Sequence, residues 1–114
     1  MQDINRVAID LAKNVFQVCA LSPHNKVLFN KKLSRKKFTE FMVQLPVSTV
    51  YMEACYSSHY WGRTLTEMGH TVHLIPAQHV TPFVRGNKND NNDALAIAEA
   101  ANRPGIRFVP IKTV

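Results

Sequence analysis

Glycine is scarce in this chain of 114 residues, and the few glycines are widely scattered. They stand at Gly62, Gly69, Gly86 and Gly105. A phosphate-cradling loop needs several glycines close together, so the spacing argues against an actin-like or sugar-kinase-like nucleotide-binding domain. The chain also lacks a Gly-x-Ser-x-Gly sequence around Ser57 or Ser58. We therefore expect these serines to cap a helix rather than act as nucleophiles.

Cysteines and long apolar runs are also few. Cys19 and Cys55 lie far apart and form no Cys-x-x-Cys motif, so a zinc site is not expected. Both fall in apolar, strand-like runs, which predicts buried free thiols rather than a disulfide. No apolar run approaches the roughly 18 residues of a membrane span, and the N-terminus lacks a secretory pattern. The expected location is the cytoplasm, without a membrane partner.

Acidic residues are outnumbered by basic ones, with 8 Asp and Glu against 14 Lys and Arg, for a net charge of +6. Hydrophobic residues make up 46% and charged residues 19%, which is typical of a soluble globular domain. The length suits a single domain over residues 1–114. The positive charge favours a polyanionic partner, although charge alone does not distinguish nucleic acid from a membrane surface.

Apolar patterning predicts a mixed five-stranded sheet with helices packed on it. The expected strands are Arg6–Leu11, Asn14–Leu21, Lys26–Leu33, Ser48–Glu53 and His70–Ile75. The expected helices run from Ser34 to about Leu45, from Ser57 or Ser58 to about Met68, briefly from Ala77, and from Asp90 to Asn102, before an extended Arg107–Ile111. Strand-helix-strand units favour parallel pairing of the later strands. This α/β order is that of ribonuclease-H-like folds.

Two carboxylates mark the junction between a polar, Asn-rich loop and the last helix. Asp90 and Asp93 are three residues apart, which places them on one face of a helix. An alternative interpretation is simple helix capping, because acids in the first turn suit the helix dipole. Asp10 and Glu53 each end an apolar strand, where a carboxylate is costly to bury unless it is paired or metal-bound.

The ends of strands in α/β sheets are where ligands bind, so the four acids could converge. Their mutual repulsion would be offset by Mg²⁺ or Mn²⁺, which prefer oxygen ligands. Two such ions about 3.5–4 Å apart can promote phosphodiester cleavage. The predicted catalytic and metal-binding residues are Asp10, Glu53, Asp90 and Asp93.

Basic residues gather around the third strand and the first long helix, at Lys31, Lys32, Arg35, Lys36 and Lys37. This cluster predicts contacts with a nucleic-acid backbone, or else a solvated helix face. Lys13 and Lys88 each lie within three residues of one of the acids and could hold a phosphate, and Arg85, in the same loop as Lys88, is a further predicted nucleic-acid contact. Aromatic rings at Tyr56, Tyr60 and Trp61 could stack on bases, although Trp61 is expected to pack on the sheet.

Three short motifs resemble the Asp-Glu-Asp-Asp insertion-sequence transposases, which are RuvC-like recombinases. The motifs are Asp10-Leu11-Ala12-Lys13, Met52-Glu53-Ala54-Cys55 and Lys88-Asn89-Asp90-Asn91-Asn92-Asp93-Ala94. The resemblance implies that Asp10, Glu53, Asp90 and Asp93 form a metal-binding tetrad. It also implies DNA as partner, a homo-oligomeric full-length protein and, in some members, a guiding bridge RNA.

Members of that family continue into a coiled-coil region and a C-terminal domain carrying a serine implicated in strand transfer. Since this sequence ends at Val114, we expect an N-terminal RuvC-like catalytic domain that does not complete recombination alone. Two alternatives stay open at this point. One is a stand-alone RuvC-like junction resolvase, and the other is a non-catalytic module that grips nucleic acid through the Lys31–Lys37 cluster.

Overall fold

A five-stranded mixed sheet forms the centre of the computed structural model, which describes residues 4–11, 15–83 and 90–112. Its strands are β1 (Arg6–Leu11), β2 (Val15–Leu21), β3 (Val27–Ser34), β4 (Thr49–Glu53) and β5 (Thr71–Ile75). They lie in the order β3-β2-β1-β4-β5. The first three are antiparallel neighbours, whereas β4 runs parallel to both β1 and β5. The predicted sheet is confirmed, with strand ends within a residue or two of those expected.

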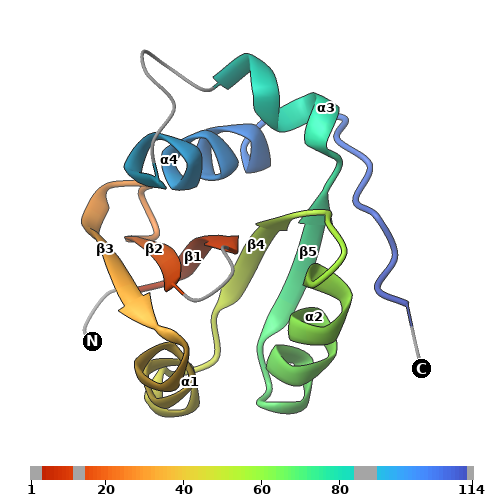
Figure 1. The fold of residues 1–114 in the computed structure, drawn as a ribbon. Helices are drawn as coiled ribbons and strands as arrows, with labels where there is room; N and C mark the ends of the chain where they lie inside the picture. The colour runs from red at the N-terminus through yellow and green to blue at the C-terminus, as the bar shows by residue number, and fades with distance from the viewer. Residues whose placement is uncertain (1–3, 12–14, 84–89, 113–114) are drawn as a thin grey trace.

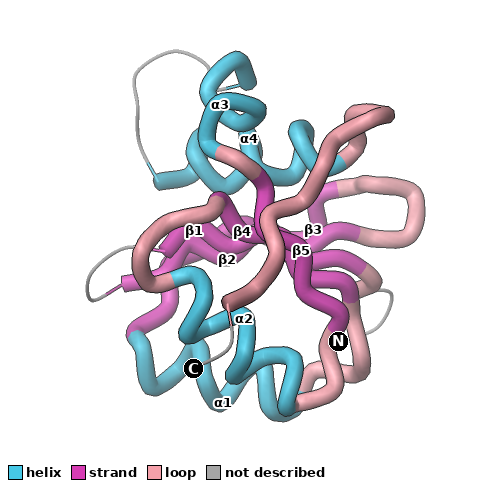
Figure 2. Tube along the Cα trace, turned by 90° about the vertical axis from the view of Figure 1, so that its right-hand side faces the viewer, coloured by secondary structure: helices cyan, strands magenta, loops and turns pink. Residues whose placement is uncertain are grey.

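Helices cover both faces of the sheet and make three layers (Figures 1 and 2). They are α1 (Arg35–Gln44), α2 (Ser58–Glu67), α3 (Ala77–Val80), a 3₁₀ turn (Thr81–Phe83) and α4 (Asp90–Ala101). α1 and α2 lie on one face, and α4 lies on the other with α3 beside it (Figure 1). Along the described ranges, no helix is long and apolar enough to cross a lipid bilayer.

Alternation along the strands separates two apolar cores. In β1, Val7 and Ile9 join the core beneath α1 and α2, whereas Ala8 joins the core beneath α4. The first core is centred on three edge-to-face rings, with Phe38 4.6 Å from Phe16 and 5.2 Å from Trp61 between ring centroids. The expected packing of Trp61 on the sheet is therefore confirmed. The second core is rich in alanine from α4, and such small side chains let a helix approach the sheet closely.

The helix ends follow the sequence signals with one difference. The Ser34 hydroxyl accepts a hydrogen bond from the Lys37 amide at 3.2 Å, which caps α1 as predicted. Ser57 stands at the N-cap of α2, but its side chain makes no capping bond. The hydroxyl of Ser58 instead accepts from the Cys55 amide at 2.9 Å and donates to the Cys55 carbonyl at 2.8 Å. The Ser58 hydroxyl thus holds the loop before α2 in place and does not cap the helix.

A buried histidine joins α1 to the start of β4. His70 is 3% exposed, and its Nδ1 accepts the Ser48 amide at 3.2 Å. Its Nε2 must then carry the proton and donate to the Met42 carbonyl, 2.9 Å away. We expect His70→Phe to lower the free energy of unfolding by about 2 kcal/mol, because two buried backbone groups lose their partner. Urea denaturation measures the loss, and an unchanged midpoint would contradict this role.

Residues 106–112 form an extended segment along β5, which confirms the extended conformation predicted for Arg107–Ile111. The Val109 amide donates to the Leu74 carbonyl at 2.7 Å. Further on, the amide of Lys112 donates to Nδ1 of His59 at 3.1 Å, and Arg63 donates to the Lys112 carbonyl at 2.6 Å. The segment therefore links the edge of the sheet to α2, and it passes down the right-hand side of Figure 1.

Candidate metal centre

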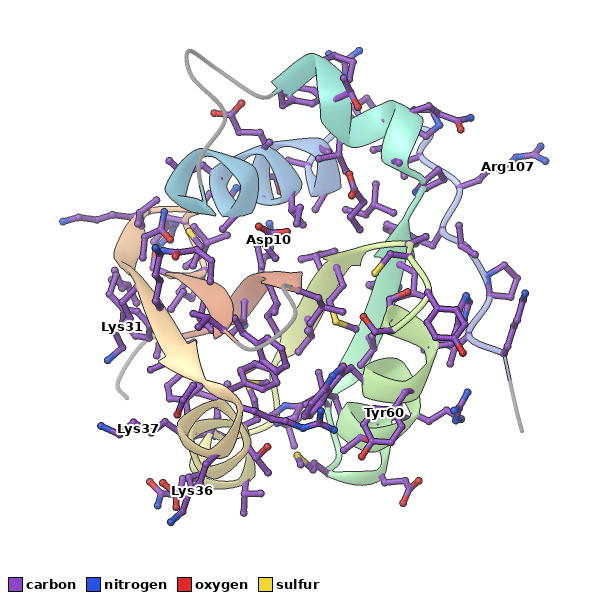
Figure 3. All side chains as sticks on the ribbon, in the orientation of Figure 1. Asp10, Lys31, Lys36, Lys37, Tyr60 and Arg107 are labelled. Atoms are coloured by element: carbon purple, nitrogen blue, oxygen red, sulfur yellow. The ribbon has the colours of Figure 1, made fainter. Side chains whose placement is uncertain are left out.

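The register of β1 and β4 places two predicted acids side by side. The last pair of Cα partners in these parallel strands is Ile9 and Met52, so Asp10 and Glu53 occupy the next positions on adjacent strands. Ala8 and Tyr51, two residues earlier, face the core beneath α4. Because side chains alternate along a strand, the carboxylates point to that same face. Figure 3 shows Asp10 in the layer between the sheet and α4.

The other two acids belong to the helix that covers this face. α4 begins at Asp90 and contacts β1, β2 and β4. Asp93 follows one turn later in the same helix. The helix start predicted at Asp90 is confirmed, and the side chains of both residues lie outside the described part of the chain. The fold therefore brings the three acid-bearing elements, β1, β4 and α4, together.

A polar row on the α4 face continues across the antiparallel strands. Asp10 is the Cα partner of Gln17, and Gln17 is the partner of Lys32. Facing residues of antiparallel strands share one side of the sheet, with their Cβ atoms about 5 Å apart. Gln17 is only 2% exposed, and its amide nitrogen donates to Asn30 at 2.7 Å. The side-chain amide of Gln17, held by Asn30, therefore lies directly beside Asp10.

Sequence analysis missed Gln17, although a signal was present. It is a glutamine inside the apolar strand Val15–Leu21, and burying an amide is costly unless its hydrogen bonds are met. Such a residue indicates a polar partner on the same face. Here the neighbour on that face is the Asp10 carboxylate.

The donor set suits a hard divalent cation. Asp10 and Glu53 are both half-buried, and carboxylate oxygens are the ligands that Mg²⁺ and Mn²⁺ prefer. Among the residues whose side chains are described, no group of three or more His, Cys, Asp or Glu lies close enough to hold a metal ion. A complete site would thus need carboxylates from outside that group, such as those of Asp90 and Asp93 on the covering helix.

The predicted basic cluster lies on both sides of the sheet edge. Lys31 pairs with Val18, which faces α1, whereas Lys32 pairs with Gln17 on the α4 face. Lys36 and Lys37 are exposed in the first turn of α1, at the lower left of Figure 3. Lys32 alone therefore shares a face with the acids among these four lysines. Lys13, Arg85 and Lys88 lie outside the described residues.

The two cysteines differ, which corrects the prediction that both are buried. Cys19 in β2 is buried, and burial raises the pKa of its thiol to about 11. Cys55 is exposed because it lies two residues past the end of β4, where the chain turns toward α2. Both thiols are free, as expected.

Three rings stack on the α4 side of the sheet, at the edge formed by β5. His73 lies 5.6 Å from Tyr51 and 4.2 Å from Phe108 between ring centroids. Burial lowers the pKa of His73 below its ordinary value of 6.5. The unfolded chain then binds a proton at a higher pH than the folded protein does, so this residue's stabilising contribution is lost as the pH falls below about 6.5.

We expect His73→Phe, which keeps a ring in the stack, to flatten the pH dependence of stability below about 6.5. The unmodified protein should lose more stability than the variant between neutral and mildly acidic solution. Urea midpoints at both pH values measure the difference. Equal slopes for the two proteins would contradict the assignment.

The architecture defined above is that of a RuvC-like fold. The structure of Thermus thermophilus RuvC aligns with a TM-score of 0.63 over 91% of this chain and 99% of that chain, at 12% sequence identity. A family model for the DEDD transposases of the IS110 type matches residues 7–113. The chain belongs to this IS110 DEDD transposase family, which confirms the resemblance found in the sequence.

Curated relatives include several bacterial transposases. A probable family 20 transposase from Pseudomonas aeruginosa is 50% identical over 97% of this chain and 33% of its own length. The transposase of insertion sequence IS1111A from Coxiella burnetii is 46% identical over 100% of this chain and 31% of its own. The transposase of insertion sequence IS1328 from Yersinia enterocolitica is 41% identical over 99% of this chain and 34% of its own length. The chain spans about a third of the length of these relatives.

Proposed function

We propose that this domain supplies the acidic centre with which an IS110-family transposase cleaves and exchanges DNA strands as a mobile element inserts and excises. The observation that carries the proposal is the pairing of β1 with β4. It sets Asp10 and Glu53 at adjacent positions on the face that α4 covers. The same helix begins at Asp90 and includes Asp93.

Four carboxylates would hold the cation, namely those of Asp10, Glu53, Asp90 and Asp93. Bound Mg²⁺ or Mn²⁺ would supply positive charge to the scissile phosphodiester and lower the pKa of the attacking oxygen. Asp10 and Glu53 are half-buried on rigid strands, which fixes the direction of their oxygens. Gln17, tied to Asn30 and paired with Asp10 across the strands, would limit how far the Asp10 carboxylate turns.

The positive side chains would position the DNA. In this proposal Lys13, Lys31, Lys32, Arg35, Lys36, Lys37, Arg85 and Lys88 contact phosphates, consistent with the net charge of +6. Contacts of this kind fix orientation without reading sequence. The same contacts would bind the phosphates of a bridge RNA, so the proposal includes such an RNA. It also includes a homo-oligomeric full-length protein.

Metal binding tests the proposal directly. Titrating Mn²⁺ into the 114-residue chain should raise its melting temperature, because a ligand at about 100 times its Kd stabilises the folded state by about 2.7 kcal/mol. The pair Asp10→Asn and Glu53→Gln should remove most of that rise, and so should Asp90→Asn with Asp93→Asn.

The matched control is Glu40→Gln with Glu67→Gln, which removes the same charge from exposed positions on α1 and α2. This control should keep the full rise. The proposal fails if Mn²⁺ leaves the unmodified protein's melting temperature unchanged, or if the control and the acid variants respond alike.

A metal-independent nucleic-acid-binding module is the second candidate. The exposed lysines of α1 favour it, since Lys36 and Lys37 lie on the side of the sheet opposite to the acids. In that case DNA affinity would fall with salt but would not respond to Mn²⁺ or to the acid variants.

A further inference from the structure

An open cavity of about 930 Å³ lies between the first turn of α1, the loop from β4 to α2, and residue 112 at the end of the extended segment. Its wall includes Ala54 and Cys55, the two residues that follow Glu53. The cavity therefore lies at the end of β4 on the side of the sheet that carries α1 and α2, whereas the Glu53 carboxylate points to the α4 side. Ligand pockets in proteins have volumes of about 300–1,000 Å³, so there is space for a small organic group.

Basic and aromatic side chains line this cavity. Arg35 lies with its guanidinium carbon 5.3 Å from the ring centroid of Trp61 and 5.9 Å from that of Tyr60. Arg63 and Lys112 contribute two more cationic side chains. No acid stands among the lining residues in the part of the chain that the structure describes. The lining is therefore complementary to an anion.

Tyr60 gives the cavity an accessible ring. It is 48% exposed, and its contact with Trp61 is edge-to-face at 5.3 Å between centroids. Figure 3 shows Tyr60 on α2 and Arg107 well above it, on the extended segment. A flat ring beside guanidinium groups is the arrangement that proteins use to bind unpaired nucleotides, with the base on the ring and the phosphate near the cations.

The backbone around the ring is held in place. The carbonyl of Lys112 accepts from Arg63 at 2.6 Å, and the Lys112 amide donates to His59. Arg63 is thereby fixed in one direction, with its remaining N–H groups available for a further acceptor. A positioned guanidinium loses less side-chain entropy when a phosphate binds.

We propose that this cavity binds one unpaired nucleotide of the DNA strand held at the acids, with its base on Tyr60 and its phosphate between Arg35 and Arg63. The assignment rests on the proposed function, since it requires a DNA strand that is held at the acids and passes around the end of β4 to the α1 and α2 side of the sheet. It adds a site for a base that has left the duplex, on the opposite face of the sheet from the acids.

Cys55 provides the test because it is exposed and lines the cavity. Cys19 is buried with a raised pKa, so iodoacetamide should label Cys55 alone in the folded 114-residue chain. A saturating single-stranded DNA of about 12 nucleotides should slow that labelling about fivefold or more. A blunt duplex of equal length should protect Cys55 less, because its bases are stacked and paired.

Two variants remove the contacts. Tyr60→Leu and Arg35→Gln should each abolish most of the protection and weaken single-strand binding about fivefold or more, measured by fluorescence anisotropy. Arg107→Gln removes the same charge from an exposed position away from the cavity and should change neither value. Melting curves establish that each variant is folded before it is compared.

The outcomes separate the two proposals. DNA that binds by anisotropy while Cys55 labels at its free rate would overturn the nucleotide site and leave the proposed function intact. Equal protection by single-stranded and duplex DNA would also overturn it. Absence of any DNA binding by the unmodified chain would overturn both.

Discussion

Replacing Glu53 with glutamine in a full-length transposase that contains this domain is expected to reduce transposition about a thousandfold or more. The substitution keeps the size of the side chain and removes one anionic oxygen from the pair that β1 and β4 bring together. Loss of several kcal/mol of transition-state stabilisation corresponds to such a factor. Excision of a marked element in cells, scored by sequencing of the repaired junction, measures it.

The control for this variant is Glu67→Gln, an identical change at an exposed position near the end of α2. It should leave transposition within a few-fold of the unmodified protein. Equal cellular levels of both proteins, measured by immunoblot, exclude an effect on folding. If the Glu53 variant transposes at a normal rate, the acidic centre is not where strand cleavage takes place.

Replacing Phe38 with alanine is expected to lower the free energy of unfolding by about 3–5 kcal/mol, the range measured for large aromatic residues in protein cores. Phe38 is fully buried and contacts both Phe16 and Trp61 edge-to-face. Its removal takes apolar surface out of contact and also eliminates two aromatic pairs, each worth about 0.5–1.5 kcal/mol. Domains of this size are stable by about 5–15 kcal/mol, so the variant should be near its unfolding threshold.

Val43→Ala is the matched control, because Val43 lies on the outer side of the same helix and is 62% exposed. Its effect should stay within about 0.5 kcal/mol. Urea denaturation followed by tryptophan fluorescence suits both variants, since Trp61 belongs to the cluster under test. A loss below about 1 kcal/mol for Phe38→Ala would show that the neighbouring rings close the gap.

Local sequence patterns predicted the elements well because their causes are local. The alternation in Arg6–Leu11, the capping serine at position 34 and the helix start at Asp90 each depend on residues a few positions apart. The convergence of strand-end acids required more, namely that β1 pairs in parallel with β4 some forty residues later. The element order suggested that pairing, and the family motifs supported it.

What escaped prediction depends on contacts between distant segments. The role of Gln17 depends on its partners on the neighbouring strands, Asp10 on β1 and Lys32 on β3. Cys55 was misjudged because its apolar neighbours in sequence do not show that the loop from β4 to α2 leaves its side chain exposed. The cavity beside Tyr60 requires residue 112 to pack against α2, which no local pattern in the sequence indicates.

The polar row across the sheet also constrains how the chain can fold. If β2 slipped by one residue against β1, Gln17 would enter the aromatic core and Phe16 would be placed among the carboxylates. Either displacement is costly, so Gln17 and Phe16 together select the correct alignment of β2 with β1 during folding. Variants that make position 17 apolar should therefore relax this selection and tolerate misaligned, aggregation-prone pairings, even where the native state itself becomes more stable.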